Sequence, residues 1–151
     1  MEKTKLVYNM FIRSTPKKVW AAVTNPEFTR EYWGGMANVS DWKKNSKWEH
    51  HNPENEVWVQ GKVVESTPPN RLVLTWIDPD KVTDESRVTF EIEAIEDLVR
   101  LTVTHDKFKP RSKMVEGVSW GWPRVLCSLK SYLETGKGIN IFAGGKRCSA
   151  D

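Results

Sequence analysis

The sequence of 151 residues contains only two cysteines and three histidines. Cys127 and Cys148 have no Cys-x-x-Cys spacing, so they indicate neither a disulfide framework nor a zinc site. His50 and His51 are adjacent, and neighbours on a strand point to opposite faces, so they cannot chelate one ion. We therefore expect no metal and no other cofactor. Cys127 is expected in the core, and the histidine pair on the surface or at a strand edge.

Long apolar runs and a strong charge of one sign are also missing. No stretch approaches the roughly 18 apolar residues that a membrane span needs, and the N-terminus lacks a signal-peptide core. The formal net charge is +3, and no basic stretch is interleaved with aromatic residues. We therefore expect a cytoplasmic protein of one domain that binds neither membrane nor nucleic acid.

Motifs of nucleophilic catalysis and of phosphate binding do not occur either. There is no Gly-x-Ser-x-Gly elbow, and no glycine-rich loop of the nucleotide-binding kinds. What the chain has in unusual number is tryptophan, with eight residues. The function must therefore be sought in an aromatic-rich interior and not in a catalytic signature.

Hydrophobic periodicity predicts an α+β domain. A strand at 6–13 is followed by a helix that starts near Thr15, with Pro16 in its first turn, and by a second short helix at 27–33. The period then changes to two, with turn residues about every ten positions, as in an antiparallel meander. The strands are expected at 37–42, 46–51, 56–65, 71–77, 86–95 and 98–106. A long helix follows at 112–135, and Gly136 ends it.

Alternation along the last two strands predicts one covered face. Its residues are Val88, Phe90, Ile92 and Ala94 on one strand and Val99, Leu101, Val103 and His105 on the next. The long helix carries a stripe of apolar residues at three- and four-residue steps, so it is expected to cover that face. One long helix opposite a curved sheet cannot fill the space beneath it evenly.

The stretch 119–136 begins with Ser-Trp-Gly-Trp-Pro, which is unusual inside a helix. We expect Trp120 and Trp122 to lie where helix and sheet diverge, and Gly121 to allow close approach of another backbone. Pro123 marks either a kink or the first turn of a helix that starts late.

Four separated motifs resemble one known family. They are RSTPKKVWAAVTNPE (13–27), GKVVESTPPNRLVLTW (61–76), LTVTH (101–105) and GWPRVLCSLKSYLETG (121–136). Together they are similar to homologues of the ATPase activator of the 90-kDa heat-shock protein, which belong to the START-like, or birch-pollen-allergen-like, superfamily. The resemblance implies a helix-grip fold with about seven antiparallel strands around an apolar cavity, and a link to the stress response. The resemblance extends to about residue 138, so the domain is expected at 1–138. The residues after it contain Gly144-Gly145 and several charges, and they are expected to form a flexible tail at 139–151.

Eight residues are candidates for the wall of that cavity. They are Trp33, Trp58, Trp76, Phe90, Val103, His105, Trp122 and Leu126. A tryptophan-rich wall with few polar groups suits an aromatic or lipid-like ligand. The first hypothesis is therefore a protein, monomeric or weakly dimeric, that binds a small apolar ligand without transforming it.

Two other hypotheses stay open. In the second, a START-like hydrolase or cyclase uses His105 as a base, with help from a tyrosine or a carboxylate. In the third, the chain is a chaperone-interaction module. The eukaryotic activators resemble the chain only in their second domain, and the Asn- and Trp-rich contact motif of their first domain does not occur in it. We therefore expect that this chain alone does not stimulate the heat-shock ATPase.

Overall fold

The computed structural model describes residues 4–141, and it has the α+β architecture that the periodicity predicts. Its elements, in chain order, are β1 (Leu6–Ile12), α1 (Pro16–Thr24), α2 (Pro26–Tyr32), β2 (Ala37–Ser40), β3 (Lys47–His51), β4 (Val57–Thr67), β5 (Arg71–Asp78), β6 (Lys81–Ile95), β7 (Leu98–Asp106) and α3 (Met114–Thr135). The predicted order of one strand, two short helices, six strands and one long helix is confirmed. The largest shift of a boundary is in β6, which starts five residues earlier than the expected residue 86.

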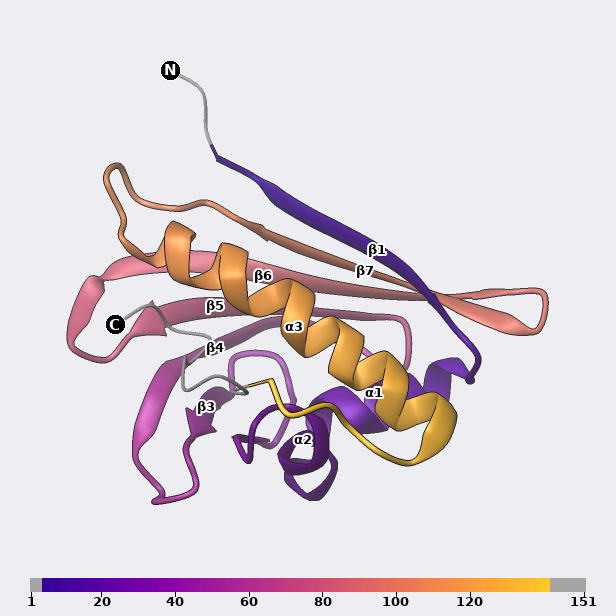
Figure 1. Cartoon of the computed structure of the whole chain (residues 1–151). Helices are drawn as coiled ribbons and strands as arrows, with labels where there is room; N and C mark the ends of the chain where they lie inside the picture. Colours follow the sequence, from indigo (N-terminus) through magenta and orange to yellow (C-terminus); the bar gives the residue numbers. More distant parts are fainter. Residues whose placement is uncertain (1–3, 142–151) are drawn as a thin grey trace.

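The strands form one antiparallel sheet of seven in the order β1-β7-β6-β5-β4-β3-β2. Strands β2 to β7 are a meander of neighbours along the chain, and β1 is added beside β7. Figure 1 shows α3 lying across one face of this sheet, with α1 and α2 near its C-terminal end. At that end Tyr32 of α2 stacks on Tyr132 of α3, with 5.9 Å between ring centroids. Helices α1 and α2 therefore close one end of the space between α3 and the sheet.

Local sequence explains where the helices begin and end. Thr15 caps α1 by accepting a hydrogen bond from the backbone N–H of Lys18, and Pro16 occupies the first turn. Asn25 ends α1 and also caps α2, because its side chain accepts from the backbone N–H of Glu27. Gly136 ends α3 in the left-handed conformation, with φ of 84°.

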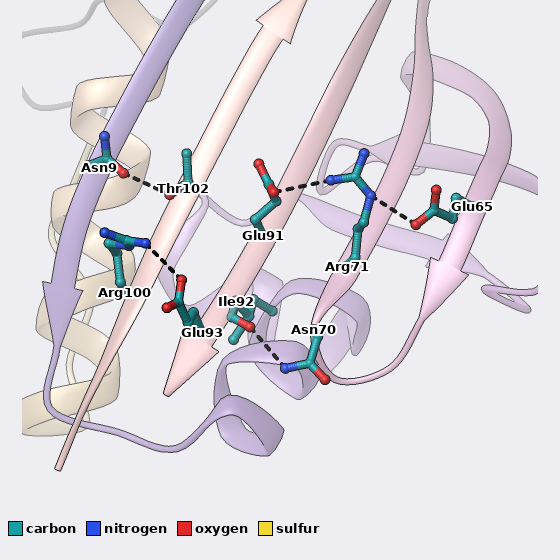
Figure 2. A network of polar contacts seen from close by, with 9 residues as sticks. All are labelled: Asn9, Glu65, Asn70, Arg71, Glu91, Ile92, Glu93, Arg100 and Thr102. Carbon is teal, nitrogen blue, oxygen red and sulfur yellow. Dashed lines mark hydrogen bonds and ion pairs between the residues drawn. The ribbon is translucent and has the colours of Figure 1, made fainter. Parts of the chain in front are cut away.

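The two faces of the sheet differ as the alternation predicts. Val88, Phe90 and Ile92 are buried toward α3, while Glu91 and Glu93 point to the opposite side. On that opposite face, side chains of β4 to β7 form ion pairs across neighbouring strands (Figure 2). Arg71 lies between a carboxylate of β4 and Glu91 of β6, at N–O distances of 2.8 and 3.1 Å. These pairs are exposed to solvent, so they add little to the stability of the domain. The core lies on the other face of the sheet, under α3.

Two expectations about the long helix are wrong, and one of two alternatives at Pro123 is excluded. Trp120 is 60% exposed, because residues two positions apart in a helix lie on nearly opposite sides and Trp122 occupies the inner one. The guanidinium of Arg124 covers the Trp120 ring at 5.0 Å. Cys127 is exposed and not in the core. The helix does not start late at Pro123, since it runs without a break from Met114 to Thr135.

The segment after α3 packs against the domain through residue 141. The hydroxyl of Ser128 accepts a hydrogen bond from the backbone N–H of Ile139, and Arg124 donates to the carbonyl of Ile141. Ile141 is only 3% exposed. The division into a domain at 1–138 and a flexible tail at 139–151 stays a prediction, since residues 142–151, with Cys148, lie outside the described part of the chain. No helix within residues 4–141 is both long enough and apolar enough to span a membrane.

Replacement of Gly61 by alanine is expected to lower the free energy of unfolding by about 1–3 kcal/mol. A Cβ at this position would overlap the carbonyl oxygen of Thr75 and would lie 2.7 Å from Nε1 of Trp48. That indole donates a hydrogen bond to the same Thr75 carbonyl at 2.7 Å, and the Trp48 ring is fully buried. Urea denaturation followed by circular dichroism measures the loss.

Gly136→Ala is the matched control. A Cβ there would meet no atom within 4 Å, so only the positive φ opposes it. We expect that variant to lose about 1 kcal/mol. A loss for Gly61→Ala no greater than for Gly136→Ala would contradict the close packing of β4 on β5.

Candidate ligand-binding cleft

A cleft of about 630 Å³ opens between the first half of α3 and the sheet. It lies at the end of α3 that α1 and α2 leave uncovered. Its floor comes from β4 and from the β5–β6 hairpin, and its roof from α3. The residues around it are Trp33, His50, Glu56, Val57, Trp58, Val59, Trp76, Asp78, Pro79, Asp80, Lys81, Asp84, Lys113, Met114, Gly117, Val118, Gly121, Trp122 and Val125.

Tryptophans from four separate elements or their ends line this cleft. Trp33 follows α2, Trp58 belongs to β4, Trp76 to β5 and Trp122 to α3. The rings of Trp33 and Trp76 lie 5.6 and 5.5 Å from that of Trp122, and all three residues are less than 10% exposed. These contacts hold the aromatic wall in one arrangement.

The glycines of α3 explain why space remains under the helix. Gly117 and Gly121 are one helical turn apart and both line the cleft. Because neither carries a side chain, α3 presents bare backbone to the cleft at these two positions. The unusual Trp-Gly-Trp-Pro stretch therefore combines one buried wall residue, Trp122, with a glycine that leaves room beside it.

His105 lies beneath the cleft and not in it. It is fully buried and receives a hydrogen bond at Nδ1 from the indole N–H of Trp122, at 3.0 Å. Because an indole nitrogen only donates, Nδ1 must be unprotonated, and the ring hydrogen is on Nε2. Nε2 is 2.7 Å from the hydroxyl of Ser86, which in turn donates to the carbonyl of Trp76. Burial lowers the pKa of His105 to about 3, so the imidazole is neutral.

This geometry does not favour the hydrolase or cyclase hypothesis. A general base needs a free lone pair within reach of the substrate. Both ring nitrogens of His105 are occupied by protein partners, and Nε2 donates to Ser86 instead of accepting its proton. Neither His105 nor Ser86 is among the residues around the cleft. The pair therefore stabilises the core and positions Trp122.

His50 is the opposite case, and its predicted place on the surface is wrong. It is 4% exposed and lines the cleft, between the rings of Trp33 and Trp76. Its Nδ1 is 2.6 Å from Oδ1 of Asn38, an acceptor, so Nδ1 carries the hydrogen. Burial, and next the charge of His51, lower the pKa of His50 to about 3. The neutral ring therefore keeps an acceptor lone pair on Nε2.

The eight candidate residues divide into two groups of four. Trp33, Trp58, Trp76 and Trp122 line the cleft. Phe90, Val103, His105 and Leu126 are buried in the adjoining core, where Phe90 packs edge-on against Trp122 at 6.0 Å. Whether any of the eight contacts a ligand stays a prediction.

Two polar residues of the cleft, Asp84 and His50, were missed for different reasons. Asp84 points to the same side as Ser86 and Val88, but the predicted strand began only at residue 86. His50 alternates with Trp48, which is fully buried, and this period of two was the available signal for an inward side chain. Among residues 4–141, no group of three or more His, Cys, Asp or Glu side chains is arranged to hold a metal ion.

Comparison with known proteins gives the family. A family model described as "Activator of Hsp90 ATPase homolog 1-like protein" matches residues 13–134. The chain belongs to this family. No match to the chain was found among curated proteins. The motifs at 13–27, 61–76, 101–105 and 121–136 fall within the matched region apart from the last two residues, so the predicted resemblance is confirmed.

Solved structures of the same fold include three relatives that cover most of the chain. A protein from Mesorhizobium loti, MLL2253, is 24% identical, with 86% of this chain and 96% of that one covered and a TM-score of 0.73. The Aha1 dimer from Colwellia psychrerythraea is 19% identical, with 89% and 99% covered and a TM-score of 0.74. PFC0360w, an HSP90 activator from Plasmodium falciparum, is 20% identical, with 85% and 95% covered and a TM-score of 0.73. At these identities the likeness shows the fold.

Proposed function

We propose that this protein binds a small apolar molecule, with an aromatic or lipid-like skeleton, in the cleft under α3 and does not transform it. The observation that carries the proposal is the wall of four tryptophans around a space of about 630 Å³. Ligand sites typically enclose about 300–1,000 Å³ and combine apolar walls with a few polar groups. The buried His50 and Asp84 are polar groups of that kind.

The neutral fluorescent probe N-phenyl-1-naphthylamine tests the proposal. We expect saturable binding at one site per chain, with an affinity of about −4 to −8 kcal/mol. Tryptophan emission should be quenched as the probe fluorescence rises, because the probe would lie against the indoles. Val118→Trp should weaken binding by about tenfold or more, since it places a large ring in a half-buried position of the cleft wall.

Val7→Trp is the control for that substitution. Val7 is 48% exposed on the edge strand β1, away from the cleft, so the same change of residue should leave the affinity unaltered. Equal affinity of Val118→Trp and the unsubstituted protein, or binding that does not saturate, would contradict the proposed site.

A chaperone-interaction module is the second candidate, because the family is described by an Hsp90 ATPase activator. Phe11 and Val7 on β1 are each 48% exposed and give the edge of the sheet an apolar surface. The test is the steady-state ATPase rate of purified HSP90 with this chain added at micromolar concentration. Ligand binding as the sole role predicts an unchanged rate, whereas a rise of several-fold would favour the second candidate.

A further inference from the structure

The rim of the cleft is negative in a chain that is positive overall. Four carboxylates and two ammonium groups lie around the cleft, which leaves a formal charge of −2, whereas the whole chain carries +3. The residues are Glu56, Asp78, Asp80 and Asp84 against Lys81 and Lys113. Charge of one sign in a concave, poorly solvated site attracts the opposite charge.

Asp84 stands apart from the other carboxylates because it is buried and only half satisfied. It is 7% exposed, and its Oδ2 accepts a hydrogen bond from the hydroxyl of Ser112 at 2.9 Å. Its Oδ1 is inaccessible to solvent and has no hydrogen-bond partner in the structure. Buried carboxylate oxygens are normally paired, because their desolvation is costly. Neither Lys81 nor Lys113 forms an ion pair with it, although both border the cleft.

The remaining walls suit a cation with an apolar body. The indoles of Trp33, Trp76 and Trp122 present π systems, which attract organic cations. His50 adds an acceptor lone pair and no donor, since its hydrogen is engaged by Asn38. His50 and Asp84, the two buried polar side chains that border the cleft, therefore offer acceptors, and neither has a free hydrogen to donate.

We propose that the ligand of this cleft is an organic ammonium ion, an amine with an aromatic or lipid-like body whose N–H groups donate to Asp84. This inference rests on the proposed function, and it specifies the chemical class of the ligand. The apolar body lies against the tryptophans, and the Asp84 carboxylate rotates on binding so that Oδ1, which is buried and without a hydrogen-bond partner, meets the ammonium group. A charge-assisted hydrogen bond of this kind is stronger than a neutral one and selects against alcohols and carboxylates of the same shape.

Three naphthalene compounds of similar size test this choice: 1-naphthylmethylamine, 1-naphthylmethanol and 1-naphthoate. Isothermal titration calorimetry at pH 7.5 compares a cation, a neutral molecule and an anion. We expect the amine to bind about tenfold more tightly than the alcohol, and the carboxylate to bind most weakly. Asp84→Asn should reduce the preference for the amine to about twofold while the affinity for the alcohol stays the same.

Two variants serve as controls on charge and folding. Asp80→Asn removes the same charge from an exposed position of the rim, so it should lower the amine affinity by no more than about twofold. Lys113→Met removes an exposed ammonium group that borders the cleft, and it should raise the affinity for the amine about two- to threefold but leave that for the alcohol unchanged. The Lys113 variant keeps the proposal testable even where Asp84→Asn is unstable.

The outcomes separate this inference from the proposed function. Similar affinities for amine and alcohol, or a preference for the amine that survives Asp84→Asn, would overturn the amine while the cleft remains a binding site. Tighter binding of the carboxylate than of the amine would also overturn it. Failure of all three compounds to bind, together with failure of N-phenyl-1-naphthylamine, would overturn the proposed function itself.

Discussion

Trp122→Ala is expected to lower the free energy of unfolding by about 3–5 kcal/mol. The Trp122 ring is 3% exposed and contacts Trp33 and Trp76 at centroid distances of 5.6 and 5.5 Å. Its removal leaves a cavity between α3 and the sheet, and it also leaves Nδ1 of His105 without a donor. Chemical denaturation measures the loss, which should come with weaker binding of N-phenyl-1-naphthylamine.

A graded series separates packing from hydrogen bonding at this position. Trp122→Phe keeps most of the ring contacts but removes the indole N–H, so it should cost about 1–3 kcal/mol. Trp120→Ala is the matched control, because it deletes the same side chain two residues away at a site that is 60% exposed. We expect that change to cost less than about 1 kcal/mol. Equal losses for Trp120→Ala and Trp122→Ala would contradict the central place of Trp122 in the core.

Acidification from pH 7.5 to pH 5 is expected to destabilise the protein by about 4 kcal/mol, about 2 kcal/mol for each buried histidine. The pKa of His50 and that of His105 are each lowered to about 3 by burial, from an ordinary value near 6.5. The unfolded chain therefore takes up two protons as pH falls through 6.5, and the folded chain does not. The stability that these neutral rings contribute is full above pH 6.5 and falls progressively toward pH 3.

The pH window identifies the groups responsible. Hydrogen bonds lower the pKa of Glu49 and that of Glu134, but those carboxyls titrate below about pH 5 and act in the same direction only there. Denaturation curves at pH 7.5, 6.5, 5.8 and 5 should give a slope that approaches two protons. His105→Gln should remove about half of that slope. A free energy of unfolding that is flat over this range would show that the folded protein accommodates both imidazolium ions.

Much of the fold could be predicted from local patterns. The change of period from 3.6 to two after residue 36 gave the correct order of elements, and the alternation of Val88, Phe90 and Ile92 gave the correct buried face. Helix ends were predictable at Thr15 and Gly136, where a side-chain cap and a left-handed glycine act within a few residues. These features depend on neighbours along the chain, which a sequence displays directly.

The candidate site could be predicted only in part. Trp33, Trp58, Trp76 and Trp122 line the space beside α3, while a role for them in ligand binding stays a prediction. The burial of His50 was missed, because it depends on the pairing of β3 with β2 and on the Trp33 ring that packs over it. Helical spacing alone puts Trp120 and Trp122 on nearly opposite sides of α3, so the sequence already contains the signal that one of them is exposed.

The sequence by itself determined which elements form, which face of the sheet is apolar and that tryptophans from separate segments are available to line one space. Tertiary structure decided which polar groups find partners. His105 is satisfied by Trp122 and Ser86, whereas Oδ1 of Asp84 is left without a partner beside the cleft. The physical reason is that the hydrophobic period shows only which way each side chain points from its own helix or strand. A hydrogen bond between side chains depends on the distance between elements that are far apart in the chain. The divergence of α3 from the sheet sets those distances, and no local pattern encodes it.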